Sequence, residues 1–119
     1  RSRNPAQPMI QLDLKGDLAD VRGAVAAAAY RVAQECLTNS LRHSSAREIV
    51  LRIERRSGAE NALLVHVEDD GGGNAAKVAA STGFGLTGIR ERITALGGSL
   101  SIADANRGVR VAATIPLAA

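Results

Sequence analysis

Aromatic residues are scarce in this sequence of 119 residues, which contains Tyr30, Phe84 and no tryptophan. The hydrophobic core must therefore be built from aliphatic side chains and alanine. A single cysteine, Cys36, excludes an internal disulfide. Because Cys36 falls on an apolar helix stripe, we expect it to be a small buried hydrophobic residue of a protein from a reducing compartment.

Charge of one sign is not concentrated either. The chain has 15 Lys and Arg against 12 Asp and Glu, a net charge of +3, and no block of basic residues. We therefore expect no direct nucleic-acid partner. No apolar run approaches the roughly 20 residues of a membrane span, so we expect no membrane contact by this domain. The length predicts one domain, expected over residues 8–119, with residues 1–7 as a linker from a longer protein.

Hydrophobic periodicity predicts the order strand–helix–strand–strand–helix–strand–strand. Such an order is typical of an α/β fold, a two-layer sandwich in which helices cover one face of a mixed, mostly antiparallel sheet. Two glycines after the second helix predict its C-terminal cap. The expected strands span 9–14, 47–54, 62–67, 99–103 and 109–116, with 62–67 central, and the expected helices span 20–42 and 86–96.

A row of polar residues borders the apolar stripe of the first predicted helix. Glu35, Asn39 and His43 recur every four residues, with Arg42 beside them, so they lie on one flank of the helix. The amide oxygen of Asn39 suits Mg²⁺, which takes oxygen ligands and keeps several waters. Glu35 can hold a metal-bound water or accept a proton, and Arg42 and His43 can contact phosphate oxygens. An ordinary solvated helix face is the alternative.

The second motif is an acid followed by glycines at the end of a buried strand. Asp69 and Asp70 precede three consecutive glycines, residues 71–73, which allow close approach of the backbone to a flat ligand. A carboxylate at Asp69 can accept a hydrogen bond from N6 of adenine, whereas guanine carries a carbonyl at that position. A plain turn is the alternative. Glu68 and Asp70 are expected to be solvated, and His66 to be an ordinary strand-face residue.

The third motif, residues 83–88, reads Gly-Phe-Gly-Leu-Thr-Gly. It satisfies G-x-G-x-x-G, but a dinucleotide-binding unit needs a preceding buried strand, and none is predicted before it. A protein-kinase glycine loop is excluded because no catalytic-loop or D-F-G signature follows. A glycine-rich loop that opens a helix can still bind phosphate through backbone N–H groups. A purely structural loop is the alternative.

Together the three segments resemble the N, D-x-G-x-G and G2 boxes of the ATP-binding catalytic domain of sensor histidine kinases. The Gly-Ile-Arg-Glu-Arg continuation at 88–92 is similar to the subfamily whose response regulators carry helix-turn-helix domains. The resemblance covers residues 8–117 and implies the α/β sandwich of gyrase, Hsp90 and MutL ATPases, the Bergerat fold. It implies that Asn39 binds Mg²⁺ with support from Glu35, that Asp69 contacts adenine, that Arg42 and His43 lie near the phosphates, that Gly71, Gly73, Gly83, Gly85 and Leu86 shape the pocket and lid, and that Thr114 lies near an adenine-bound water.

The resemblance further implies that the domain holds ATP with Mg²⁺ and donates the γ-phosphoryl group to a histidine of an upstream dimerisation domain. A response regulator would be an indirect partner, and the domain would be a cytoplasmic part of a membrane-attached sensor. Neither His43 nor His66 is followed by Asp or Glu, as in the acceptor motif, so we expect no autophosphorylation. Alternatives are an ATP-binding switch or an anti-sigma-type serine kinase. A nicotinamide-binding oxidoreductase is disfavoured because the βαβ context is absent.

Overall fold

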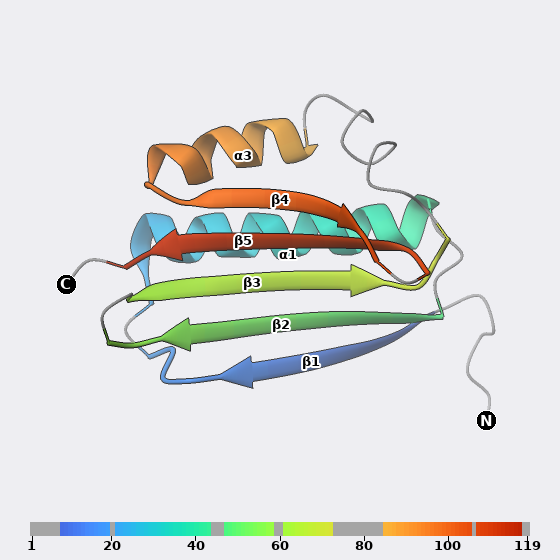
Figure 1. Cartoon of the computed structure of the whole chain (residues 1–119), viewed down its shortest axis with the longest axis horizontal. Helices are drawn as coiled ribbons and strands as arrows, with labels where there is room; N and C mark the ends of the chain where they lie inside the picture. Colours follow the sequence, from blue (N-terminus) through green and yellow to red (C-terminus); the bar gives the residue numbers. More distant parts are fainter. Residues whose placement is uncertain are drawn as a thin grey trace.

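The computed structural model of the chain describes residues 8–19, 21–43, 47–58, 61–72, 85–105 and 107–117, with only the backbone at 42–43 and 85–87. These residues form a five-stranded sheet of strand order β1-β2-β3-β5-β4 and two helices (Figure 1). β1 and β2 pair in parallel, and the other neighbours pair antiparallel. The elements are β1 (Met9–Lys15), α1 (Gly23–His43), β2 (Glu48–Arg56), β3 (Ala62–Asp69), α3 (Gly85–Ala95), β4 (Ser99–Asp104) and β5 (Val109–Pro116).

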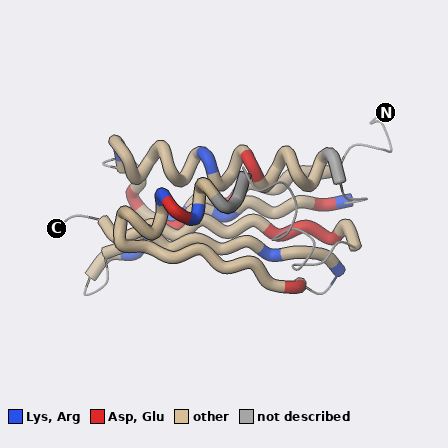
Figure 2. The backbone as a smooth tube through the Cα atoms, turned by 90° about the horizontal axis from the view of Figure 1, so that it is seen from above, with Lys and Arg blue, Asp and Glu red and all other residues tan. Residues whose placement is uncertain are grey.

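The sheet has one covered and one open face, which confirms the predicted two-layer α/β sandwich. Both helices lie on the same side of the sheet (Figure 2). Along the central strand β3, Val65 and Val67 are buried towards the helices, whereas His66 alternates with them on the open face. The core is aliphatic, as the shortage of aromatic residues predicts. None of the helices that the structure describes is long and apolar enough to cross a lipid bilayer.

The helix α1 carries the apolar stripe that the sequence predicts. Ala29, Val32 and Cys36 are buried in the core, and Val25 packs against it. Their spacing of three and four residues places them on one side of the helix. The helix begins at Gly23, later than the predicted residue 20, and ends at His43.

The edge strand β1 is more exposed than its apolar sequence suggests. Ile10, Leu12 and Leu14 remain 48%, 58% and 54% exposed. β1 pairs with β2 alone among the described strands, and α1 does not close over it. An open apolar groove of about 630 Å³ therefore separates β1 and β2 from α1, with Tyr30 and Leu37 on its helical side.

The predicted glycine cap of α3 is confirmed. Gly97 has a φ of +84° and donates its N–H to the Thr94 carbonyl, while the Gly98 N–H reaches back to the Ile93 carbonyl. These two bonds form a Schellman motif, which satisfies the last carbonyl groups of the helix. The cap turns the chain directly into β4.

Gly97→Ala should lower the free energy of unfolding by about 1–2 kcal/mol, because an L-residue pays that amount in the left-handed region. Gly88→Ala is the matched control. Gly88 is inside α3, and a Cβ there meets nothing within 4 Å, so the change should stabilise by about 0.5–1 kcal/mol. Urea denaturation measures both. Equal effects of the two substitutions would contradict the role given to the cap.

Candidate functional site

Two segments that are far apart in the sequence come to the same end of the sandwich. The last turns of α1 and the end of β3 lie there, and α3 runs away from that side of the molecule (Figure 1). Asn39 and Ser40 belong to the first segment, Asp69 ends the second, and Gly85 opens α3. The described parts of the first two motifs meet through Ser40 and Asp69.

Asp69 is fixed at this end by two hydrogen bonds. The Ser40 hydroxyl donates to Oδ2 at 2.7 Å, and the Gly71 backbone N–H donates to Oδ1 at 2.9 Å. An ionised carboxylate has about four lone-pair positions, so each oxygen of Asp69 keeps capacity for a further donor. The two hydrogen bonds orient the Asp69 carboxylate and leave acceptor positions for a further donor.

Ser40 supports the candidate site and could not be recognised from the three sequence motifs. It follows Val32 and Cys36 at steps of four on the buried stripe, and only 6% of it is exposed. A hydroxyl at a core position of an apolar stripe needs a buried acceptor, and Asp69 is that acceptor. A serine on the apolar stripe therefore indicates a buried hydrogen bond, but the identity of its partner depends on the fold.

Gly108 is the second missed residue. A Cβ at this position would lie 2.5 Å from Oδ1 of Asp69 and closer still to the Asp69 carbonyl oxygen. Only glycine leaves room for the strand end and its carboxylate. The preceding residue, Arg107, accepts a hydrogen bond from the Gly72 N–H at 2.6 Å. The β4–β5 turn thus supports the segment that follows β3.

Glu35 and Asn39 lie on the half-buried flank of α1, one turn apart. Neither side chain has a hydrogen bond or ion pair to another described residue. The described part of the chain contains no cluster of three metal-binding side chains, so it offers no protein cage for a metal. Mg²⁺ does not need one, because it is usually held by one or two protein oxygens together with waters and phosphates. The amide oxygen of Asn39, which has no partner among the described residues, fits that sparse requirement.

Asp70 and Glu68 have structural partners instead. Asp70 Oδ1 accepts hydrogen bonds from the backbone N–H groups of Glu48 and Arg47 at 3.0 and 2.8 Å, and these bonds lower the pKa of Asp70. Burial raises the pKa of Glu68, but its bonds to Arg110 and His66 outweigh burial and lower it. Asp70 therefore ties the start of β2 to the end of β3, and Glu68 belongs to an ion-pair cluster on the open face.

The structure does not bring every proposed residue to this end. Thr114 pairs with Leu64 and faces the open side of the sheet, so it is not next to Asp69. At the end of β5 that lies near Asp69, the buried residue is Val109 and not Thr114. Arg42 and His43 form the last turn of α1, and Gly85 and Leu86 open α3. Only the backbone of these four residues is described. Gly73 and Gly83 lie outside the described residues.

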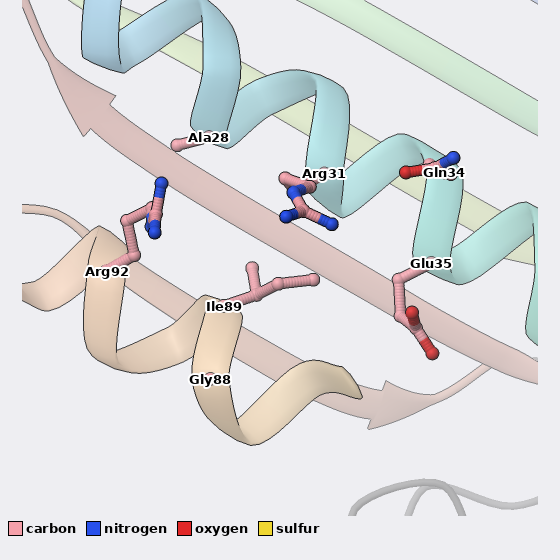
Figure 3. Close-up of a pocket in the computed structure, with 7 residues that line it drawn as sticks. All are labelled: Ala28, Arg31, Gln34, Glu35, Gly88, Ile89 and Arg92. Atoms are coloured by element: carbon pink, nitrogen blue, oxygen red, sulfur yellow. The ribbon is translucent and has the colours of Figure 1, made fainter. Parts of the chain in front are cut away.

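A polar cleft of about 230 Å³ runs between α1 and α3 (Figure 3). Ala28, Gly88 and Ile89 are among its lining residues. Arg31 and Glu35 of α1 project into it, and Glu35 is the lining residue one turn before Asn39. The cleft therefore opens beside the candidate site.

A family model described as histidine kinase-, DNA gyrase B-, and HSP90-like ATPase matches residues 24–119. The chain belongs to this family. The matched range includes the Asn39, Asp69 and Gly85 segments. As a member of this ATPase family, the chain is an ATP-binding domain, and the Ser40–Asp69 end of the sandwich is its candidate nucleotide site.

Members with sensor functions are similar to this chain. It is 39% identical over 87 residues to the signal transduction histidine-protein kinase/phosphatase UhpB of Salmonella typhimurium, a match over 73% of this chain and 16% of UhpB. It is 37% identical over 75 residues to the sensor histidine kinase ComP of Bacillus subtilis, over 61% of this chain and 9% of ComP. The histidine kinase domain of the blue-light activated histidine kinase EL346 of Erythrobacter litoralis superposes with a TM-score of 0.70 at 27% identity, over 95% of this chain and 57% of that one.

Ser40→Ala should lower the free energy of unfolding of this ATPase domain by about 2 kcal/mol, because a hydrogen bond to a charged group contributes about 1.5–3 kcal/mol. Ser101→Ala is the control. The Ser101 hydroxyl makes an exposed 3.5 Å contact with the Ala112 carbonyl, so its removal should cost less than about 0.5 kcal/mol. Denaturant unfolding of both variants tests the bond, and equal costs would contradict its importance.

The thiol of Cys36 should be inert in the folded domain. Burial, followed by the negative charges of Glu35 and Asp69, raises the pKa of Cys36 to about 12. Because the unfolded chain ionises this thiol earlier, stability should be intact below about pH 9 and fall as the pH rises towards 12. Cys36→Ala should remove this component of the alkaline loss. Thiol titration at pH 8 should be slow unless denaturant is added, and rapid titration of the native protein would contradict the assignment.

Proposed function

We propose that this chain binds ATP with Mg²⁺ and donates the γ-phosphoryl group to a histidine of another domain, as the catalytic domain of a sensor histidine kinase. The observation that carries the proposal is the oriented carboxylate of Asp69, held by Ser40, the residue that follows Asn39 on α1. The similarity to UhpB and ComP supports histidine as the acceptor class. Because the chain spans 16% and 9% of these relatives, the activity of the whole protein belongs to the proposal.

Adenine is recognised by Asp69 in this proposal. Its carboxylate accepts a hydrogen bond from the N6 amine, and it is pre-oriented because Ser40 and Gly71 already occupy one position on each oxygen. The preference over guanine follows from the carbonyl that guanine presents at the same place. Gly108 keeps the carboxylate at the strand end, since any side chain there would displace it.

When bound, the phosphates and the metal would lie towards α1 and the start of α3. The amide oxygen of Asn39 would hold Mg²⁺, and Glu35, one helical turn away, would orient a water of the ion. The backbone at Gly85 and Leu86 opens α3, where the positive end of the helix dipole favours phosphate. Arg42 and His43 follow Asn39 by one turn and add positive charge. Phosphoryl transfer needs mostly positioning and charge stabilisation from the protein, and these groups supply both.

The acceptor histidine belongs to another domain. His66 lies on the open face, in contact with Glu68, whereas Asp69 faces the helices. The sheet therefore stands between His66 and the candidate site of the same molecule. An upstream dimerisation domain of a membrane-attached sensor would supply the acceptor, and a response regulator would receive the phosphoryl group afterwards. A serine kinase of the anti-sigma type remains the rival, and the amino acid that is phosphorylated distinguishes the two.

Asp69→Asn should weaken ATP binding about tenfold or more, because a hydrogen bond to a charged group is worth about 1.5–3 kcal/mol. It should also reduce the preference for ATP over GTP, since an amide N–H can donate to the guanine carbonyl. Isothermal titration with both nucleotides measures these changes. An unchanged ATP to GTP ratio would remove Asp69 from base recognition, and an equal loss of melting temperature without nucleotide would assign it a structural role.

Asn39→Ala is the paired variant. It should abolish the strengthening of ATP binding by Mg²⁺ and leave binding in EDTA nearly unchanged, whereas Asp69→Asn should weaken binding under both conditions. If Asn39→Ala retains the response to Mg²⁺, the metal assignment is wrong while the adenine assignment stands.

A further inference from the structure

The cleft between α1 and α3 is lined by two arginines that have no ion-pair partner among the described residues. Arg31 projects into it from α1 and Arg92 from α3, and both side chains are exposed (Figure 3). Among the described residues, neither arginine forms an ion pair or a side-chain hydrogen bond. Glu35 follows Arg31 by four residues, a spacing that allows pairing on a helix, yet the two do not pair. Two guanidinium groups thus face the same space unneutralised.

Few acids lie outside the described residues. Segments 1–7 and 73–84 contain neither Asp nor Glu, and the only acids outside the described residues are Asp20 and Glu60. Among the described residues, no carboxylate pairs with Arg31 or Arg92. Both guanidinium groups are therefore available to a carboxylate of another molecule or domain.

The lining of the cleft suits the side chains of a closely packed segment. Gly88 has no side chain, Ala28 has a small one, and Ile89 adds an apolar surface. A volume of about 230 Å³ accepts a few side chains. Glu35 lines the same cleft and is one turn from Asn39, so an occupant would sit beside the proposed phosphate position.

We propose that the α1–α3 cleft docks an acidic segment of the protein that receives the phosphoryl group, with carboxylates of that segment paired to Arg31 and Arg92. The inference rests on the proposed function, because it places the acceptor next to the γ-phosphate. Carboxylate is the chemistry that guanidinium groups recognise best among protein side chains. Complementary charge of this kind sets the register of a docked partner and accelerates its encounter with the cleft.

The experiment uses the full chain, isotopically labelled, and an alanine-based helical peptide with two glutamates four residues apart. Amide shifts of Ala28, Gly88 and Ile89 report on the cleft in heteronuclear NMR spectra. The wild type should show saturable shifts there, and the double variant Arg31→Glu/Arg92→Glu should bind about tenfold more weakly. Arg22→Glu/Arg56→Glu makes the same charge change at exposed positions outside the cleft and should bind as the wild type does.

Charge exchange provides the decisive comparison. A peptide with lysines in place of the glutamates should bind the Arg31→Glu/Arg92→Glu variant and not the wild type. If a glutamine peptide shifts the same amides as strongly as the glutamate peptide, or if the control variant loses binding equally, the proposed docking site is wrong.

A titration with ATP and Mg²⁺ separates this inference from the proposed function. The wild type should show shifts around Asp69 and Gly71, and the double variant should retain them. Loss of ATP binding in the double variant would place the arginines in the nucleotide site and overturn the docking proposal. Absence of ATP binding in the wild type would instead overturn the proposed function, whatever the peptides do.

Discussion

The hydrogen bond from Ser40 to Asp69 joins the two layers of the sandwich at the end where the site lies. It connects α1 to the last residue of β3, and Gly108 closes the space beneath it. A carboxylate that turns to another partner gives up its bonds to the Ser40 hydroxyl and the Gly71 N–H, which opposes its rotation. The position of Asn39, one residue before Ser40, is consequently fixed relative to Asp69. The distance between the groups proposed to read the base and to bind the metal is thus a property of the core.

The sequence allowed most of the architecture to be predicted because its patterns are local. The stripe of Ala29, Val32 and Cys36 reports the buried side of α1, and the Gly97-Gly98 pair reports the end of α3. The continuous apolar run before Asp69 indicated a central strand, and β3 is central. These features depend on the periodicity of a single element or on backbone conformations that glycine alone adopts readily.

Contacts between elements could not be predicted in the same way. Ser40 matters because of Asp69, which is 29 residues away, and Gly108 matters because the β4–β5 turn folds against that same residue. The side of the sheet that Thr114 occupies depends on the register of β5 with β3, where a shift of one residue reverses every side chain. The two arginines of the α1–α3 cleft likewise come to line one cleft only when the two helices pack together.

The exposed edge strand β1 limits the solubility of the isolated chain. Backbone N–H and C=O groups on its outer side sit among Ile10, Leu12 and Leu14, which are about half exposed, and such an edge invites strand-to-strand stacking between molecules. Mutual repulsion is weak at a net charge of +3. Aggregation should therefore limit the protein concentration that can be reached. Additives that solvate aliphatic surface should raise this concentration more than changes in salt do.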